Sequence, residues 1–462
     1  FRLMADLVLN HCSKESEWFE AFKRGAKPYD RYFIAVERGT DLSSVVRPRA
    51  LPLVHEYDTS TGKKLVWTTF SEDQVDLNFA EPAVLLEMLD VFLGYVARGV
   101  QIVRLDAIAY LWKEIGTSSI HHPKTHAVVK LFRAVVEAVA PWVVIITETN
   151  VPHEENISYF GTDGDEAHMV YQFSLPPLVL DAFLRERVDH LFEWASSLPP
   201  VRPDVTFFNF LASHDGVGLL PAKGLLSDDE IAALIESVRQ RGGLISYKST
   251  PEGDIPYEMN INYLEAIAEA ALPDEQRARK FLTSQAIMLA MAGVPGIYVH
   301  SLIGSTNYTE GVKRSGHNRT INREKLEYEQ VSQELREEGT LRNLVFAGYK
   351  HLLEIRATEP AFHPAASQVI VDCGPTIFGV LRASSERDEE VLEDEEDQGN
   401  ILCLHNVSHD PAECVIDRGI VGLGDARVME NLVEGGAIFP HDEGGGRVSI
   451  GLDAYEVMWL KW

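Results

Sequence analysis

The chain has 462 residues, which is too long for one small module and predicts two or three domains of ordinary size. Apolar residues make up 45% and charged residues 24%, both near globular averages, which excludes a disordered, collagen-like or coiled-coil chain. Asp and Glu outnumber Lys and Arg by 70 to 42, and the formal charge of -28 argues against binding to nucleic acid or to an anionic membrane surface.

The apolar segments are short, and the cysteines are few. The longest apolar segments, residues 142–146 and 286–299, fall below the roughly 20 residues that a transmembrane helix needs, so no membrane span is predicted. No two of the four cysteines are spaced as CxxC, which indicates neither a zinc site nor a disulfide framework. The sequence therefore predicts a reducing, cytoplasmic location.

Up to residue 358, short apolar runs alternate with longer amphipathic runs, the pattern of βα units around a parallel sheet. Six runs have the continuously apolar texture of buried parallel strands: residues 3–9, 100–105, 143–147, 168–173, 205–211 and 294–299. Helices are predicted over residues 83–98, 124–140, 177–196, 274–291 and 340–358. Six strands are two short of a (β/α)8 barrel, and the chain begins at Phe1 directly on the first strand. We therefore expect residues 1–358 to form a TIM barrel that lacks its first two βα units.

Two connections within this region are too long to be turns. Residues 12–73 and 216–273 exceed the roughly 15 residues beyond which a loop in a compact domain is usually functional. In a barrel they would cover the mouth, because βα loops emerge at the C-terminal ends of the strands.

The sequence pattern changes after Pro360. Residues 359–462 carry short β-rich runs at 367–372, 377–383, 401–407 and 455–462, which predict a C-terminal β-sandwich. Residues 386–398 are almost entirely acidic and are predicted to form a solvated hairpin loop.

Three carboxylates lie at or just past the ends of predicted strands: Asp106, Glu148 and Asp215. Any one of these carboxylates, taken alone, is equally well explained as an acidic residue that caps a helix or lies in a loop. Three in succession favour a site, because a charge at the end of an apolar strand is costly unless water and ligand reach it at a barrel mouth.

Retaining glycoside chemistry needs two carboxyl groups roughly 5 to 5.5 Å apart, one ionised as nucleophile and one protonated as general acid. Arg104 lies two residues before Asp106, on the same face of the strand, and its charge is expected to keep Asp106 ionised. Glu148 follows apolar residues with no cation adjacent in sequence, so apolar surroundings are expected to suit it to the acid/base role.

Four segments resemble, in order, those of the α-amylase superfamily of glycoside hydrolases and transglycosylases: DLVLNH at 6–11, VRLDAIAY at 103–110, TE at 147–148 and FLASHD at 210–215. QVDLN at 74–78 resembles the superfamily's extra motif. The resemblance implies Asp106 as nucleophile, Glu148 as acid/base and Asp215 as the acid that grips two sugar hydroxyls. It places His11, Arg104 and His214 at the same sugar subsite.

Within the superfamily, the sequence is most similar to the sucrose phosphorylase group, on segments 47–57, 65–79, 104–126 and 316–326. This likeness implies that phosphate, in place of water, attacks a covalent glucosyl enzyme and gives α-glucose 1-phosphate with retained configuration. The substrates would be a small-molecule α-glucoside and inorganic phosphate, with no other cofactor.

A phosphate dianion needs local cations to enter an acidic mouth on a protein of charge -28. Arg47, Arg49 and Arg319 are candidates. The resemblance points to Arg47 with Tyr110 for phosphate and to Arg319 for the glucosyl subsite. The alternative for the RPR segment is a surface turn stiffened by proline.

Segments 257–263 and 300–312 look more like phosphorylases of glucosylglycerate or sucrose 6-phosphate than like sucrose phosphorylase. Both aglycones are anionic, so a cation is expected near the acceptor, and Lys313 and Arg314 are the candidates. In the alternative interpretation, these segments only pack the lid.

No metal is predicted. Asn10 matches a calcium position of many amylases, but the phosphorylase group resembles a calcium-free branch. A helix start explains His121, His122 and His126 better than a zinc site, which would want further ligands. Trp67, Trp112 and Tyr110 are equally well explained as sugar platforms or as core.

Two rival functions stay open. One is a retaining α-glucosidase or transglucosidase with the same three acids, and the other is a catalytically inactive barrel that acts as a binding module. Inactive relatives usually lack one of these acids, whereas Asp106, Glu148 and Asp215 are all present. The sequence gives neither the aglycone nor the source. It leaves the oligomeric state open, with a homodimer as one alternative.

Overall fold

The computed structural model describes residues 1–48, 51–200, 202–250, 253–384 and 399–462, so Arg49 and the acidic segment 386–398 lie outside the described residues. The chain divides into two compact units. The first consists of Phe1–Tyr171 and Tyr247–Tyr257, and the second of Gln172–Ser246 and Glu258–Trp462. No helix of the described part combines the length and the apolar character that crossing a bilayer requires.

A parallel sheet organises the first unit. Its strands follow the order β1 (Met4–Val8), β7 (Ile102–Asp106), β8 (Val144–Thr147) and β9 (Met169–Tyr171). These are the first four predicted strands. β7, β8 and β9 are largely buried, as their apolar sequences suggest, whereas in β1 only Leu7 is buried. Helices α2 (Pro82–Ala97) and α3 (Pro123–Val139) begin with proline at the first turn, where no amide hydrogen bond is lost. They meet through Phe92 and Phe132, whose ring centroids lie 5.1 Å apart. A short helix, α4 (His153–Ile157), follows β8.

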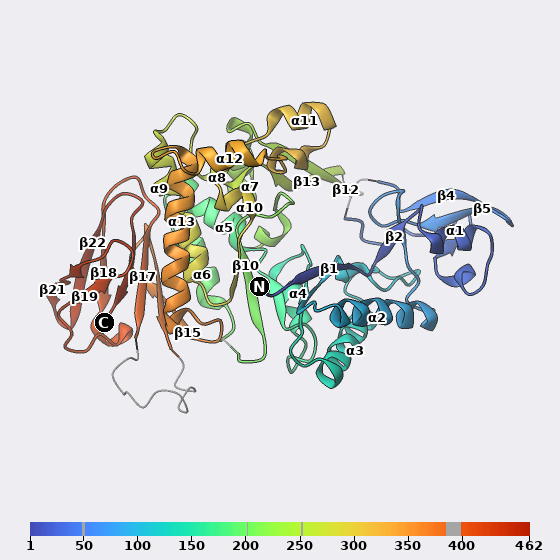
Figure 1. Cartoon of the computed structure of the whole chain (residues 1–462), viewed down its shortest axis with the longest axis horizontal. Coiled ribbons are helices and arrows are strands. Elements are labelled where there is room, and N and C mark those ends of the chain that lie inside the picture. Colours follow the sequence, from blue (N-terminus) through green and yellow to red (C-terminus); the bar gives the residue numbers. More distant parts are fainter. Residues whose placement is uncertain (49–50, 201, 251–252, 385–398) are drawn as a thin grey trace. The chain divides into compact units, whose positions relative to one another are not determined.

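The long connection of the first unit is more regular than its sequence suggests. It contains α1 (Glu17–Lys23), whose first turn is capped by the Ser16 side chain. The strands are β2 (His11–Ser13), β3 (Ala35–Val36), β4 (Val54–Thr59), β5 (Gly62–Trp67) and β6 (Gln74–Asp76). β3, β5 and β4 form an antiparallel sheet, and β2 pairs with β6. Figure 1 shows α1 beside the β4–β5 hairpin.

The second unit contains two predicted barrel strands, β10 (Thr206–Phe210) and β14 (Val294–Gly296), which pair in parallel. The predicted helix over residues 177–196 is wrong as a single element. It consists of α5 (Leu175–Arg185) and α6 (Asp189–Ser197), because Glu186 takes a left-handed conformation with φ of 53° that ends the first helix. The other two predicted helices are α9 (Asp274–Ala290) and α13 (Leu341–Thr358).

The connection over residues 216–273 contains helices and strands. Its longest helix is α7 (Asp228–Gln240), which begins with a capping box of Ser227 and Glu230. The remaining elements are β11 (Val217–Gly218), β12 (Leu244–Thr250), β13 (Gly253–Asn260) and α8 (Tyr263–Ile267). Three short helices follow β14: α10 (Val299–Leu302), α11 (Thr309–Ser315) and α12 (Tyr328–Glu334).

The C-terminal region is all-β, as predicted, with one short helix, α14 (Arg418–Val421). One sheet has the order β15 (Ser367–Asp372), β16 (Ile377–Ala383), β17 (Ile401–Asn406), β23 (Val457–Lys461), β19 (Met429–Asn431) and β20 (Ala437–Ile438). The other has the order β18 (Ala412–Asp417), β22 (Arg447–Leu452) and β21 (His441–Gly444).

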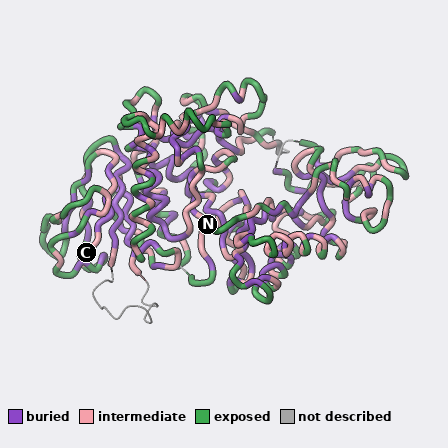
Figure 2. The backbone as a smooth tube through the Cα atoms, viewed as in Figure 1, coloured by how far each residue is buried: buried purple, intermediate pink, exposed green. Residues whose placement is uncertain are grey.

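The two faces of β17 pack against different partners. Leu402 and Leu404 join the core between the two sheets. Cys403 faces the other way, into the large core that includes Phe281 of α9 and Tyr349 of α13. Every residue of β17 is therefore buried, as the purple trace in Figure 2 shows.

A histidine within this packing makes the stability of the sandwich depend on pH. His405 is fully buried, and its Nδ1 donates to the carbonyl of Phe378 at 3.0 Å. Burial lowers the pKa of His405 from 6.5 to about 4. Between pH 6.5 and about pH 4, the histidine binds a proton in the unfolded chain but not in the folded protein. Acidification through this range therefore lowers the free energy of unfolding, by about 3 kcal/mol when it is complete.

We therefore expect the free energy of unfolding of His405→Gln to fall less with decreasing pH than that of the wild type. Urea unfolding at pH 7, 6 and 5 measures this difference. The exposed His441 gives the control variant His441→Gln, which should keep the wild-type slope between pH 7 and pH 5. Equal pH slopes for wild type and His405→Gln would contradict the assignment.

Candidate active site

Arg104 is the centre of the acidic cluster in the first unit. Its Nη1 donates to Asp106 Oδ1 at 2.7 Å and to Asp6 Oδ1 at 2.6 Å, and its Nε donates to the Tyr171 hydroxyl at 3.0 Å. Burial lowers the pKa of Arg104, but the surrounding acids and Tyr171 raise it above its ordinary value overall. The guanidinium is therefore a fixed positive charge beside Asp106, as its spacing in the sequence predicted.

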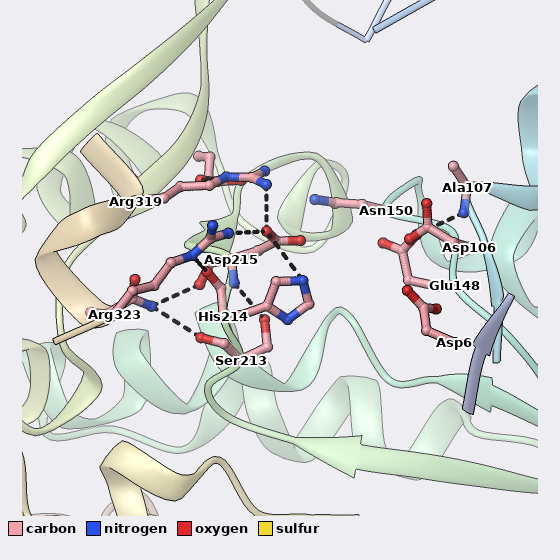
Figure 3. Close-up of polar contacts among 12 residues, drawn as sticks. Asp6, Asp106, Ala107, Glu148, Asn150, Ser213, His214, Asp215, Arg319 and Arg323 are labelled. Atoms are coloured by element: carbon pink, nitrogen blue, oxygen red, sulfur yellow. Dashed lines mark hydrogen bonds and ion pairs between the residues drawn. The ribbon is translucent and has the colours of Figure 1, made fainter. Parts of the chain in front are cut away.

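Glu148 lies beside the same guanidinium. Its Oε2 is 3.7 Å from Arg104 Nη2 and accepts the backbone N–H of Ala107 at 3.2 Å. Leu105 pairs with Thr147 in register, so Asp106 and Glu148 leave neighbouring strands whose backbones run about 4.8 Å apart. Figure 3 shows the two carboxylates facing one another. The expectation of apolar surroundings without a cation is wrong for Glu148, because the cation comes from the adjacent strand.

Aromatic residues connect two further predicted residues. The His11 ring is 5.4 Å from Phe70, and Phe70 in turn lies edge-on to Tyr110 at 5.4 Å. His11 Nε2 contacts Gln74 Nε2 at 2.8 Å. Burial raises the pKa of the Tyr110 hydroxyl, which keeps it neutral. The structure therefore brings His11 and Tyr110 onto one aromatic cluster.

A buried ion pair lies behind His11. Lys113 Nζ contacts Asp76 Oδ2 at 2.7 Å and donates to Asn10 Oδ1 at 2.6 Å. Asp76 also accepts from Asn10 Nδ2 and from the N–H and hydroxyl of Thr69. The ammonium thus sits at Asn10, the position that resembles a calcium ligand, and it joins the ends of β1 and β6 to the chain that follows β7.

Removing this ammonium should destabilise the protein strongly. Lys113→Met leaves the Asp76 carboxylate buried without its cation, which should cost about 3–5 kcal/mol of unfolding free energy. Lys63→Met, which breaks an exposed pair with Glu56, should lower the free energy of unfolding far less, because solvent screens that pair. Urea unfolding measures both, and the double variant Lys113→Met/Asp76→Asn should recover part of the loss. A Lys113→Met loss as small as that of Lys63→Met would contradict the prediction.

Asp215 is the centre of the polar cluster in the second unit. Its Oδ1 accepts from Arg319 Nη1, and from Arg323 Nη2 at 3.1 Å; His214 Nε2 lies 3.7 Å away (Figure 3). Asn322 Nδ2 donates to the main-chain carbonyls of Ser213 and Asp215 at 3.0 Å each, which fixes the loop after β10. The second unit thus brings Asp215, His214 and Arg319 together.

Glu258 holds Arg319 from its other side. Its carboxylate, only 1% exposed, accepts from Arg319 Nε at 3.0 Å and from Arg319 Nη2 at 2.5 Å. This two-point contact orients the planar guanidinium more firmly than a single ion pair would.

The two candidate phosphate-binding residues differ in exposure: Arg47 is exposed, whereas Tyr110 lies on a turn with the buried residues Ile108 and Ala109. Arg47 is exposed on a loop that is tied to a neighbouring loop by Ser44 Oγ, which donates to Thr117, and by the Val46 N–H, which donates to Ser118. In the part of the chain that the structure describes, no hydrogen bond or ion pair links Arg47 to Tyr110.

The candidate acceptor cations already have partners. Lys313 pairs with Glu310 at 2.9 Å, and Arg314 contacts the Tyr308 hydroxyl.

The three histidines of the zinc alternative face separate acids. His121 lies 3.2 Å from Glu155, His122 lies 3.5 Å from Glu114, and His126 lies 2.8 Å from Glu166. Within the described ranges, no three His, Cys, Asp or Glu side chains gather as a metal site. Trp67 is 1% exposed in a core with Val45 and Leu53, so the core alternative holds for this tryptophan.

Sequence reasoning missed Asp6, Lys113, Glu258 and Arg323 as members of these clusters. Asp6 and Arg323 stood inside segments that carry the family resemblance, which was the available signal. Lys113 and Glu258 also lie inside such segments, 104–126 and 257–263, but only their long-range contacts to Asp76 and Arg319 show what they do.

Comparison with known proteins assigns the family. The family model for the α-amylase catalytic domain matches residues 1–214. A glucosylglycerate phosphorylase of Spirochaeta thermophila is 60% identical over 461 residues, which are 100% of this chain and 77% of that protein. The chain belongs to the α-amylase family, in the group of its phosphorylases.

Two further comparisons agree with this α-amylase family assignment. A glucosylglycerate phosphorylase of Escherichia coli is 47% identical over 83% of this chain and 69% of its own length. The crystal structure of a sucrose 6F-phosphate phosphorylase from Thermoanaerobacter thermosaccharolyticum matches with a TM-score of 0.73 at 22% identity, over 88% of this chain and 80% of that one. That likeness shows the fold, a TIM barrel with a C-terminal β-domain.

Proposed function

We propose that the protein is a retaining phosphorylase of glucosylglycerate, which transfers the glucosyl unit to phosphate and gives α-glucose 1-phosphate and glycerate. The observation that carries this proposal is the pair of carboxylates, Asp106 and Glu148, in register on adjacent strands and on one guanidinium. The phosphorylase relatives at 60% and 47% identity support phosphate as acceptor and glycerate as aglycone.

The first half-reaction follows from the two carboxylates. Asp106, beside the Arg104 guanidinium, attacks the anomeric carbon while Glu148 gives a proton to the departing glycerate oxygen. A covalent glucosyl-Asp106 ester results. In the second half-reaction phosphate attacks the same carbon from the opposite face, Asp106 leaves, and two inversions give net retention.

The remaining site residues hold the substrates in this proposal. Asp215 accepts hydrogen bonds from two sugar hydroxyls, and His11, His214 and Arg319 complete the glucosyl subsite. Arg104 both binds at this subsite and donates to Asp106. Arg47 and Tyr110 bind phosphate, since a cation must offset the acids around the reacting carbon. No cofactor or metal takes part in the proposed reaction.

The test is phosphate dependence. The enzyme is incubated with α-glucosylglycerate with and without phosphate, and α-glucose 1-phosphate and free glucose are both measured. Phosphate-dependent release of α-glucose 1-phosphate is the expected result. In the reverse direction, α-glucose 1-phosphate should be consumed with glycerate and far more slowly with fructose, fructose 6-phosphate or glycerol. Glucose release at the same rate without phosphate would establish an α-glucosidase instead, and no turnover at all would support a binding module.

Arg47→Ala tests the phosphate site separately. Loss of one charge-assisted hydrogen bond of about 1.5–3 kcal/mol should raise the KM for phosphate by roughly 10-fold to 100-fold. The KM for α-glucosylglycerate should stay near the wild-type value. Lys63→Ala, at an exposed residue of β5 in the same connection, serves as the control. An unchanged KM for phosphate in Arg47→Ala would remove Arg47 from the site.

A further inference from the structure

The residue that follows Asp106 has an unusual backbone conformation. Ala107 lies in the left-handed region, with φ of 50° and ψ of 33°. An L-residue other than Gly, Asn or Asp seldom adopts this region, because Cβ approaches the neighbouring carbonyl oxygen. The strained residue stands directly between the end of β7 and a short 3-10 turn, Ile108–Tyr110.

The surroundings hold this conformation in place. Ile108 and Ala109 are 0% and 1% exposed, and Leu111 is 0% exposed, so the turn is anchored in the core. The N–H of Tyr110 donates to the carbonyl of Ala107 at 3.2 Å. Strain of this kind persists only where packing and hydrogen bonds over-determine it, and it concentrates at functional sites.

The strained turn redirects one hydrogen bond of the parallel ladder. The N–H of Glu148 donates to the carbonyl of Leu105 at 3.1 Å, so in a continued ladder the N–H of Ala107 would bond to the main-chain carbonyl of Glu148. Because the chain turns away at Ala107, this N–H instead donates to the side-chain Oε2 of Glu148 at 3.2 Å. Arg104 Nη2 approaches the same oxygen at 3.7 Å.

We propose that Ala107 is a positioning residue for proton transfer: its left-handed turn aims the backbone N–H at Glu148 Oε2, so that the transferable proton resides on Oε1. This inference rests on the proposed function. An oxygen that accepts an N–H and faces a guanidinium is the poorer site for a proton, and the other oxygen therefore carries it.

The Oε1 proton passes to the glycosidic oxygen as the bond from that oxygen to the anomeric carbon breaks, and the bonding electrons stay on the oxygen. An Asp106 carboxylate oxygen bonds to the anomeric carbon. Glu148 is left as a carboxylate, whose new charge the N–H of Ala107 and Arg104 stabilise.

The test compares leaving groups in Ala107→Val. A β-branched residue disfavours positive φ, so the turn should relax and the donor should move away from Oε2. Glycerate needs a proton to leave, whereas fluoride leaves from α-glucosyl fluoride without one. We expect kcat/KM for α-glucosylglycerate to fall by about 10-fold to 100-fold, the loss of a hydrogen bond to a charged group, and kcat/KM for α-glucosyl fluoride to fall much less. Ala107→Gly, which keeps the left-handed turn, should restore the wild-type ratio of the kcat/KM values for the two substrates.

Ser119→Val is the matched control, because Ser119 has the same strain, with φ of 51°, in a neighbouring loop. It should leave the ratio of the two substrates unchanged. Equal losses on both substrates in Ala107→Val, or no loss on either, would overturn the positioning role. Ala107→Thr, which is also branched at Cβ, gives the same readout if the Val variant does not fold. Absence of wild-type phosphorolysis of α-glucosylglycerate would refute the proposed function separately, and the ratio would then be measured on the α-glucoside that the enzyme does cleave.

Discussion

Asp106→Asn is expected to lower kcat/KM by roughly 10⁴-fold or more on every α-glucoside, α-glucosyl fluoride included. The amide cannot displace a leaving group from the anomeric carbon, however good that leaving group is. Arg104 would also lose the carboxylate that it contacts at 2.7 Å, while its contact with Asp6 at 2.6 Å remains. Steady-state kinetics on both substrates measure the loss.

The control for this prediction is Asp6→Asn. Asp6 accepts from the same nitrogen of Arg104, Nη1. It lies inside β1, however, and not at the end of a strand next to Glu148. It should lower kcat/KM by a much smaller factor. Residual activity of Asp106→Asn above that of Asp6→Asn would show that the nucleophile is another group.

Glu148→Gln is expected to lower kcat/KM on α-glucosylglycerate by about 10²-fold to 10⁴-fold, the usual contribution of general acid catalysis. The amide keeps the shape of the side chain but has no proton of carboxylic acidity to give to glycerate. Formation of the glucosyl enzyme from α-glucosyl fluoride should survive, because fluoride leaves unprotonated. The fluoride-to-glycerate ratio of kcat/KM is the measurement that separates this variant from Asp106→Asn.

Glu155→Gln provides the matched control for Glu148. Glu155 lies on α4, just beyond β8, its side chain is 50% exposed, and it contacts His121. Its change should leave the fluoride-to-glycerate ratio of kcat/KM near that of the wild type. A Glu148→Gln variant that lost both substrates equally would fit a structural role and not an acid/base role.

Much of the barrel scaffold could be predicted because it rests on local patterns. Buried parallel strands are continuously apolar, so β7 and β8 could be recognised, and Asp106 and Glu148 were distinguished as charges that end such strands. The position of Arg104, two residues before Asp106, placed both on one face of β7, and the structure confirms their contact.

Other features could not be predicted because they depend on distant contacts or on single backbone angles. The break between α5 and α6 follows from the left-handed Glu186, which has no glycine to announce it. The cation beside Glu148 comes from a neighbouring strand, so the residues adjacent to Glu148 in sequence gave the wrong expectation. The turn at Ala107 was hidden for the same reason as that at Glu186, since alanine does not mark a left-handed position.

The most direct test of the account is to identify the residue that carries the sugar. Glu148→Gln is treated with α-glucosyl fluoride, quenched and digested, and the peptides are read by tandem mass spectrometry. We predict that Asp106 gains one glucosyl unit, and that phosphate added before quenching removes it as α-glucose 1-phosphate. A glucosyl unit on any other residue, or release of the β-anomer, would contradict the central claim that Asp106 and Glu148 act as a nucleophile and acid/base pair.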